Sequence, residues 1–282
     1  TGSITITYGA NGNIAITPNG TGAIQLDGLS WPTADGSANQ VLKTDGSGAL
    51  SWTAASSGAS NVNGLSDALI EDNSLYLGQD PSSTTSTAEY NLSLGATALD
   101  AVTTGDGNTA VGFNALTANT SGEGNVAIGY NTLAANTTAS QNLAMGYNAL
   151  AIQTTDGEYN TAVGNYTLDN NTIGDRNVAL GYVALTANSE GSKNTGIGTS
   201  SSKANTTGSQ NTSVGNSSLY SNTSASYNTA IGGRALYNAN RTADTDGYNT
   251  ALGYNAGNTG TNDITTGNKN TLLGASTAAS AA

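Results

Sequence analysis

The stretch NVAIGYNTLAANTTASQ, residues 125–141, is one unit of a repeat that fills most of this 282-residue chain. Each unit begins with an Asn, a small or β-branched residue, a small residue, an aliphatic residue and a Gly. Successive units are mostly roughly 17 residues apart, and the last two steps are longer; so regular a period predicts one structural unit stacked many times. The eleven asparagines that begin the units are Asn91, Asn108, Asn125, Asn142, Asn160, Asn177, Asn194, Asn211, Asn228, Asn249 and Asn270.

The five-residue motif reads as a short strand that ends in a turn. The third residue after Asn is aliphatic in every copy, as in Ile128, so we expect it to face the core together with the first. The residue between them is mostly Ala, and we expect this small side chain to let a neighbouring subunit approach closely. The Gly is predicted to adopt positive φ or to permit tight stacking. The residues assigned to this structural repeat are Asn108, Gly112, Asn125, Gly129, Asn142, Gly146, Asn160, Gly164, Asn177 and Gly181.

A leucine stands eight residues after the Asn in most copies and predicts a second inner row on a second short strand. A polar stretch then forms a turn. We therefore predict an all-β fold, a trimeric parallel β-solenoid with about 17 residues per coil and a rod length on the order of 50 Å. The leucines are Leu99, Leu116, Leu133, Leu150, Leu168, Leu185, Leu219 and Leu236.

Composition narrows the function classes. Net charge is −12 and there is no basic stripe, so we expect no nucleic-acid partner and no anionic membrane surface. There is no Cys and no His, which excludes thiolate zinc sites, cysteine catalysis and His-based triads. No apolar run is long enough to span a bilayer as a helix, so we expect no membrane insertion. No cofactor is expected.

Three regions are expected. Residues 1–55 form a β-rich collar or shaft, with short strands at 4–6, 14–16 and 24–26 and a hairpin at 40–52. The two tryptophans of this region, Trp31 and Trp52, are candidates for a ligand platform, but a role as packing anchors is favoured. Residues 56–90 form a linker, with a helical turn at 65–70 and a degenerate first repeat at 73–78. Residues 91–282 form the eleven-repeat solenoid. The chain begins without Met and ends inside an unfinished repeat, so we expect it to be part of a longer protein.

The motifs at 108–112, 125–129 and 228–232 resemble the head repeats of trimeric autotransporter adhesins, which fold as left-handed parallel β-rolls of three chains. The longer pattern Asn-Thr-Ala-x-Gly-x-x-Ala-Leu, with the segment at 39–48, is more similar to bacteriophage tail-fibre and virion fibre proteins. The adhesin likeness is weakened by the longer period of this repeat and by the lack of heptads and of a membrane-anchor barrel. The sequence also lacks the self-cleaving chaperone domain that ends many phage fibres.

Few residues are candidates for chemistry. The pairs Asp106/Glu123 and Asp156/Glu158 have the residue types of glycosidase acids but are expected to be solvated turn residues. Asp244, Asp246 and Asp263 carry oxygen ligands suited to Ca²⁺, although a plain loop is the favoured interpretation. The tyrosines that follow the repeat Gly are candidate glycan contacts, set against a stacked ladder that stabilises the solenoid: Tyr130, Tyr147, Tyr182 and Tyr254.

A recurring Thr after the Asn, as in Thr109, suggests an ice-binding face. Val126 and Leu143 occupy the same position and favour a mixed inner row instead. The expected role is therefore structural and non-enzymatic: a virion fibre segment in a homotrimer that contacts other fibre proteins and a host-surface glycan or protein. The alternatives are a bacterial cell-surface adhesin and a polysaccharide-degrading tailspike. Specificity is expected in the longer turns, 237–248 and 258–269.

Overall fold

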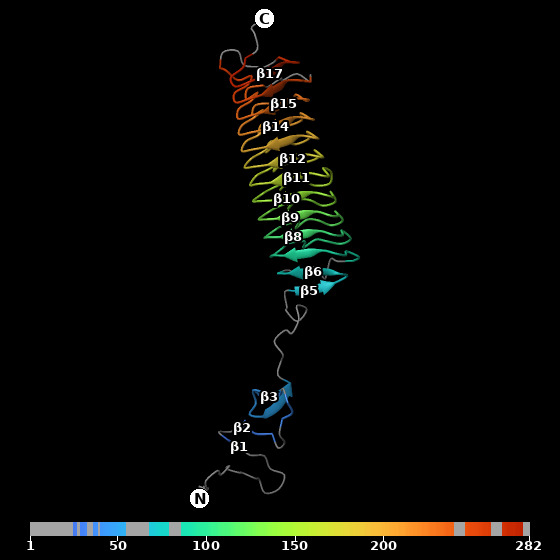
Figure 1. Ribbon diagram of the computed structural model, residues 1–282. Coiled ribbons are helices and arrows are strands. Elements are labelled where there is room, and N and C mark those ends of the chain that lie inside the picture. The colour runs from blue at the N-terminus through green and yellow to red at the C-terminus, as the bar shows by residue number, and fades with distance from the viewer. Residues whose placement is uncertain are drawn as a thin grey trace, which may run out of the picture. The chain divides into compact units, whose positions relative to one another are not determined.

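The structure is a computed structural model that describes residues 25–26, 29–32, 36–38, 40–54, 68–78, 86–239, 246–260 and 267–278. The chain divides into two compact units, Thr1–Ser60 and Asn61–Ala282. Every regular element in these described ranges is a β-strand, and none is a helix (Figure 1). The predicted all-β class is therefore confirmed.

The first unit contains two small antiparallel pairs, β1 (Gln25–Leu26) with β2 (Leu29–Ser30) and β3 (Gln40–Thr44) with β4 (Leu50–Ala54). The second pair is the predicted hairpin. The Asp45 carboxylate accepts hydrogen bonds from the backbone N–H groups of Ser47 and Ala49 at 2.8 and 3.0 Å, and these bonds lower the pKa of Asp45. The strands predicted at 4–6 and 14–16 lie outside the described residues.

Packing around the tryptophans agrees with an anchoring role for one of them. The ring of Trp52 lies so close to Gly36 that a Cβ there would come within 2.6 Å of it. Trp52 nevertheless keeps 38% of its surface exposed, and Trp31 keeps 39%. The tryptophans are therefore only partly enclosed within this small unit.

The second unit is built on one 13-stranded sheet whose strands follow chain order from β5 to β17. The strands are β5 (Ala68–Glu71), β6 (Ser74–Leu77), β7 (Leu92–Leu94), β8 (Thr109–Val111), β9 (Val126–Ile128), β10 (Leu143–Met145), β11 (Thr161–Val163), β12 (Val178–Leu180), β13 (Thr195–Ile197), β14 (Thr212–Val214), β15 (Thr229–Ile231), β16 (Thr250–Leu252) and β17 (Thr271–Leu273).

Residues 68–71 are strand and not helix, so the helical turn predicted at 65–70 is wrong where the structure describes it. β5 pairs antiparallel with β6, whereas β6 pairs parallel with β7. The degenerate repeat at 73–78 thus supplies a true first coil, and β5 lies against its outer edge. The apolar residues at 68–70 therefore belong to a strand that pairs with β6 in a hairpin, and not to a helical turn.

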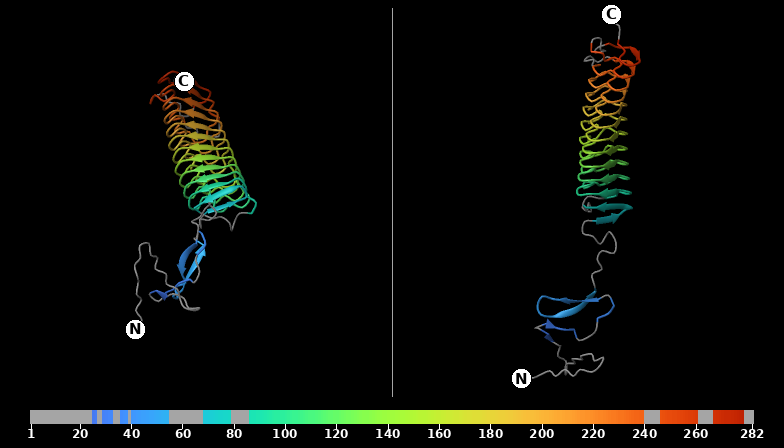
Figure 2. Two further views of the ribbon diagram at one scale, coloured as in Figure 1. Left: turned by 60° about the horizontal axis from the view of Figure 1, so that its bottom comes forward. Right: turned by 60° about the vertical axis from the view of Figure 1, so that its left-hand side comes forward.

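From β6 onward every neighbouring pair is parallel and flush, with each repeat position opposite its own equivalent; Ala127, for example, pairs with Ala144. Figures 1 and 2 show the coils stacked on one another with one strand per coil. The structure is therefore the predicted parallel β-solenoid of about eleven coils, and equivalent residues of most neighbouring coils are about 17 residues apart.

The core is lined differently from the prediction. The central residue of each strand, such as Ala110 or Ala127, is fully buried, whereas its aliphatic neighbours Val111 and Ile128 are only half-buried. The predicted inner row of Val and Ile is therefore wrong, and so is the proposed role of Ala in subunit contact. Sequence alternation sorted the two faces correctly, but the inner position holds a small residue in every coil between the end strands, where Tyr76 and Leu272 occupy it.

The predicted leucine row is buried, but it lies in turns and not on a second strand. Leu116, Leu133 and Leu150 are fully buried, and each has φ near +50°, a left-handed conformation that is uncommon for leucine. Backbone ladders hold these turns: the N–H of Leu116 donates to Thr132 O at 3.0 Å, and that of Leu133 donates to Ala149 O at 3.1 Å. Stacking between coils thus offsets the local strain.

The repeat Gly residues also have positive φ, as predicted. Gly181 has φ of 128°, and a Cβ there would meet the carbonyl carbon of Gly198 at 2.8 Å. The same close approach recurs from coil to coil. This position therefore requires glycine for two reasons, its backbone conformation and the proximity of the next coil.

Candidate functional site: polar ladders, an outer face and aromatic rows

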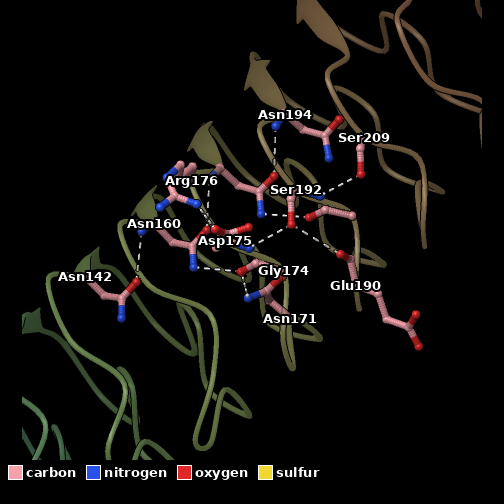
Figure 3. A network of polar contacts seen from close by, with 12 residues as sticks. Asn142, Asn160, Asn171, Gly174, Asp175, Arg176, Glu190, Ser192, Asn194 and Ser209 are labelled. Carbon is pink, nitrogen blue, oxygen red and sulfur yellow. Dashed lines mark hydrogen bonds and ion pairs between the residues drawn. The ribbon is translucent and has the colours of Figure 1, made fainter.

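The repeat Asn builds a continuous buried ladder along the solenoid. The backbone N–H of Asn177 donates to Oδ1 of Asn160, and the N–H of Asn194 donates to Oδ1 of Asn177, each at 2.9 Å. The amide Nδ2 of Asn177 donates to the carbonyl of Gly191, also at 2.9 Å. Figure 3 shows this arrangement around Asn142, Asn160 and Asn194. Each Asn therefore joins the start of one coil to the turn that closes it.

A second ladder was missed by sequence reasoning, which treated these residues as polar turn. Asn136 donates through Nδ2 to Oδ1 of Asn119 at 2.8 Å and to the carbonyl of Ala139 at 3.0 Å. Asn171, Asn188, Asn205 and Asn222 repeat this pattern, and Gln153 takes the place of Asn in the coil between Asn142 and Asn160, which is one residue longer. The signal was available, because an Asn recurs at a fixed distance after the repeat Asn.

The side chains at the first and third positions of each strand from β7 to β17 form a surface that we call the outer face. Two rows run along β7–β17. One row holds Leu92, Thr109, Val126, Leu143, Thr161, Val178, Thr195, Thr212, Thr229, Thr250 and Thr271. The other holds Leu94, Val111, Ile128, Met145, Val163, Leu180, Ile197, Val214, Ile231, Leu252 and Leu273. Every residue of both rows is half-buried or exposed in the isolated chain.

The recurring threonines belong to the outer face, so their assignment to a mixed inner row is also wrong. Thr250 and Thr271 are exposed, and Thr195, Thr212 and Thr229 are half-buried. Burial inside the coil, which weighed against an ice-binding face, therefore does not apply. The mixture of Thr with bulkier Leu and Val in the same row remains.

The four candidate glycan-contact tyrosines are all exposed, but only Tyr130 and Tyr147 stack on each other directly; Tyr166, 5.3 Å from Tyr147 and tilted by 59°, links them to Tyr182. Tyr130 and Tyr147 stack with ring centroids 5.0 Å apart and an angle of 5° between their planes, and Phe113 extends the stack at 5.4 Å. Tyr182 instead meets Tyr166 edge to face at 6.4 Å. The fourth, Tyr254, lies near Gly233. Exposed fractions are 43% for Tyr130, 42% for Tyr147, 55% for Tyr182 and 59% for Tyr254.

Two further ring stacks lie outside the predicted set. Tyr220 and Tyr237 stack at 4.8 Å, and the Arg234 guanidinium lies 4.7 Å from the ring of Tyr237. Tyr227 and Tyr248 stack at 4.9 Å. A hydrogen bond to the Asp246 carboxylate raises the pKa of Tyr248. Stacked rings with a nearby cation supply flat, amphipathic surface suited to sugars or peptides.

The acidic pair Asp156/Glu158 lines a shallow pocket of about 260 Å³ together with Thr155, Gly157, Ile173 and Asp175. Asp175 forms an ion pair with its neighbour Arg176. By contrast, the carboxylate of Asp106 accepts a hydrogen bond from the backbone N–H of Glu89 at 2.8 Å, and Glu123 lies in the next turn with its own N–H donating to Ser140. Of the two predicted acidic pairs, Asp156/Glu158 therefore lines a pocket, whereas Asp106 and Glu123 lie in successive turns.

Two features bear on metal and membrane binding. Across the described ranges, no group of three or more acidic side chains is placed to hold a metal ion. Of the predicted calcium-binding residues, Asp246 is described, whereas Asp244 and Asp263 lie outside the described residues together with the middle of both longer turns. No helix long and apolar enough to cross a membrane occurs in the part of the chain that the structure describes.

Desolvation also shifts the pKa values of two neighbouring side chains. Desolvation raises the pKa of Asp169, although hydrogen bonds from the Thr186 hydroxyl and from backbone N–H groups oppose the shift. Desolvation likewise raises the pKa of the nearby Tyr166 phenol, with a contribution from Tyr147.

Comparisons with protein-family models, with curated proteins and with solved structures find no match to this chain.

Proposed function

We propose that this chain is a rod-like segment of a homotrimeric extracellular fibre, a phage tail fibre or other virion appendage, that supports attachment to a host surface. One observation carries this proposal: the unbroken, in-register stack from β6 to β17. About eleven coils at about 4.8 Å per strand make a rod on the order of 50 Å long. Buried Asn ladders join each coil of this rod to the next.

The exposed rings supply the adhesive part of the proposal. Tyr130 and Tyr147 present a stacked, solvent-exposed pair, and rings of this kind stack on sugars while their hydroxyls form hydrogen bonds. Three copies in one fibre would multiply a weak contact. Partners are then a host-surface glycan or protein and the neighbouring proteins of the fibre.

The experiment measures binding of the purified chain to a glycan array, to a panel of bacterial cells and to a panel of animal cells. The test variant is Tyr130→Ala with Tyr147→Ala, and the matched control is Tyr90→Ala, an exposed tyrosine outside these stacks. We expect wild type and control to bind and the double variant to lose at least tenfold in apparent affinity. Absence of binding to every glycan and cell type would refute the adhesive role, whereas binding to animal cells alone would favour the bacterial-adhesin alternative.

The Asp156/Glu158 pocket is the observation that favours a polysaccharide-degrading tailspike. Paired carboxylates beside a hollow have the composition of a glycoside-hydrolysing site. Release of reducing sugar from bacterial capsule, abolished by Asp156→Asn and Glu158→Gln, would establish this activity. No release from capsules of cells that the chain binds would exclude it for those polymers.

A further inference from the structure

We propose that the outer face of β7–β17 is the surface on which copies of this chain associate, side by side and with their coils parallel. The inference deepens the proposed function, because that function requires a multichain fibre and the outer face supplies its interface. The second copy is the occupant to which the following observations point.

The first observation is apolar exposure. Large aliphatic side chains of the outer face remain open to solvent in the isolated chain: Leu94 is 49% exposed, Leu180 46% and Leu252 46%. These leucines belong to the row at the third strand position, which is aliphatic in every strand from β7 to β17 and runs along the sheet without interruption because neighbouring strands are in register. Monomeric proteins rarely expose one contiguous apolar patch of more than a few hundred Å².

The second observation is area. Eleven strands at about 4.8 Å and three residues per strand at about 3.3 Å define a strip of roughly 50 by 10 Å. This flat projection is about 500 Å², and the protruding side chains enlarge the area that can be buried, so it is of the same order as the roughly 800 Å² that each partner buries in a stable interface. The outer face is therefore of the size class of a specific interface.

The third observation is charge. None of the outward strand positions of β7–β17 carries a charged residue, although the chain has 7 basic and 19 acidic residues. From β7 to β17 the described charged residues are in turns, as are Glu123, Arg176 and Lys203. Depletion of charge is what distinguishes the centre of an interface from the rest of a surface.

The fourth observation is the arrangement of the Thr-containing row, which favours parallel copies. Its earlier strands include Leu92, Val126, Leu143 and Val178, whereas β13–β17 hold only Thr. Parallel association places the aliphatic half of one copy against the same half of the next. Antiparallel association would oppose that half to the Thr rows and bury hydroxyls against aliphatic groups.

Identical spacing makes the second copy a better partner than another protein. Every coil presents the same two outward positions, and only a surface with the same coil repeat matches them at each level. A second copy of this solenoid has the same coil spacing because it has the same sequence. Three such faces can enclose a common axis, in agreement with the proposed trimer.

The first test measures molar mass by light scattering. Wild type should give three times the 27.9 kDa of a single chain. The variant Ile128→Lys with Leu180→Lys, which places charges on the outer face, should fall to the mass of a single chain. The control Ile173→Lys alters a 50% exposed apolar residue in a turn and should keep the wild-type mass.

A second test does not depend on the folding of a weakened variant. Since the chain has no cysteine, Thr212→Cys on the outer face reports contact directly. Parallel copies should form an interchain disulfide in dilute, oxidising solution, while Thr207→Cys in an exposed turn should not. Thr109→Cys and Thr250→Cys, near opposite ends of the face, should each cross-link in a parallel complex but not in an antiparallel one.

Several outcomes would overturn the proposal. A wild-type mass equal to that of a single chain, or a folded lysine variant that keeps the wild-type mass, would contradict it. A monomer that also shows thermal hysteresis would reassign the same face to ice binding. Loss of cell binding with mass and cross-links intact would instead count against the proposed attachment function and leave the interface standing.

Discussion

Asn177 offers the sharpest test of how the solenoid is held together. Replacing it with Ala removes the acceptor of the Asn194 N–H and the donor to the Gly191 carbonyl. Asn177 and Asn194 are both buried, so water cannot readily replace these partners. At about 1–3 kcal/mol for each of the two buried polar groups left unpaired, we expect Asn177→Ala to destabilise the adjoining coils by about 2–6 kcal/mol.

Asn177→Asp separates the two hydrogen bonds. An ionised Asp still accepts from the Asn194 N–H but turns a second negative oxygen toward the Gly191 carbonyl. Burial and this contact should raise the pKa of the introduced carboxyl above its usual value of about 4. Once protonated, the carboxyl can donate to Gly191 as the amide does. The variant should therefore approach wild-type stability at low pH and lose it as pH rises through the raised pKa.

Hydrogen exchange read by mass spectrometry is the appropriate assay, because coils of a solenoid can open locally and a single unfolding free energy is not defined. Peptides spanning 160–194 should lose protection in Asn177→Ala, while those spanning 91–125 should change little. The control Asn216→Ala removes an exposed amide that accepts only a local bond from Ser217. Equal protection in Asn177→Ala and Asn216→Ala would refute the view that the Asn ladder supports the coils.

Three other changes follow from the same structure. Asp169→Asn should raise the melting temperature at pH 7, because the half-buried carboxyl has a raised pKa; the carboxyl's disadvantage disappears once it is protonated in both the folded and the unfolded chain, so the gain should vanish below about pH 4, and a gain that persists at pH of about 3 would contradict the desolvation argument. Gly181→Ala should be strongly destabilising by thermal melting, since its φ is 128° and the new Cβ would approach Gly198; a melting temperature equal to wild type would show that the coils can separate freely. Leu116→Ala should cost about 2–5 kcal/mol as a core truncation, measured by loss of hydrogen-exchange protection around 108–133, and unchanged exchange there would refute a packed leucine row.

The repeat predicted the topology because a constant number of residues between equivalent positions brings each strand beside the equivalent strand of the preceding coil. Once each Asn lies above the preceding Asn, parallel register follows for every residue between them. The hairpin at 40–54 was equally accessible, since turn chemistry at Asp45 and Gly46 fixes its register locally. These features depend on neighbours in sequence or on exact repetition.

The direction of the side chains was harder to predict, because it depends on coil width. Alternation showed that Ala127 and Ile128 face opposite sides, but not which side is inside. Hydrophobicity favoured Ile, whereas the space within so short a coil admits Ala and the turn leucine Leu133. The left-handed leucines were also hidden, since local propensity argues against them and only contacts between coils sustain them.

Of the candidate site, exposure of Tyr130 and Tyr147 was predictable from their position after the Gly, and their stacking follows from the repeat. Tyr182 departs because the intervening coil carries its ring one position later, at Tyr166, which turns that contact edge-on. The pocket beside Asp156 likewise arises in the coil that is one residue longer than its neighbours. In the aromatic row and at the pocket, the geometry that was not predicted thus lies where a coil departs from the 17-residue period.

The strands lie across the direction in which the coils stack, and this sets the response to a pulling force. Tension along the stack loads the hydrogen bonds between successive coils, and those bonds yield one coil at a time. A released coil of about 17 residues, at about 3.4 Å per residue, extends by roughly 50 Å beyond the roughly 4.8 Å that it occupied. Each coil is thus a unit of extensible length, and a chain pulled from its ends would lengthen in steps and dissipate energy at each step.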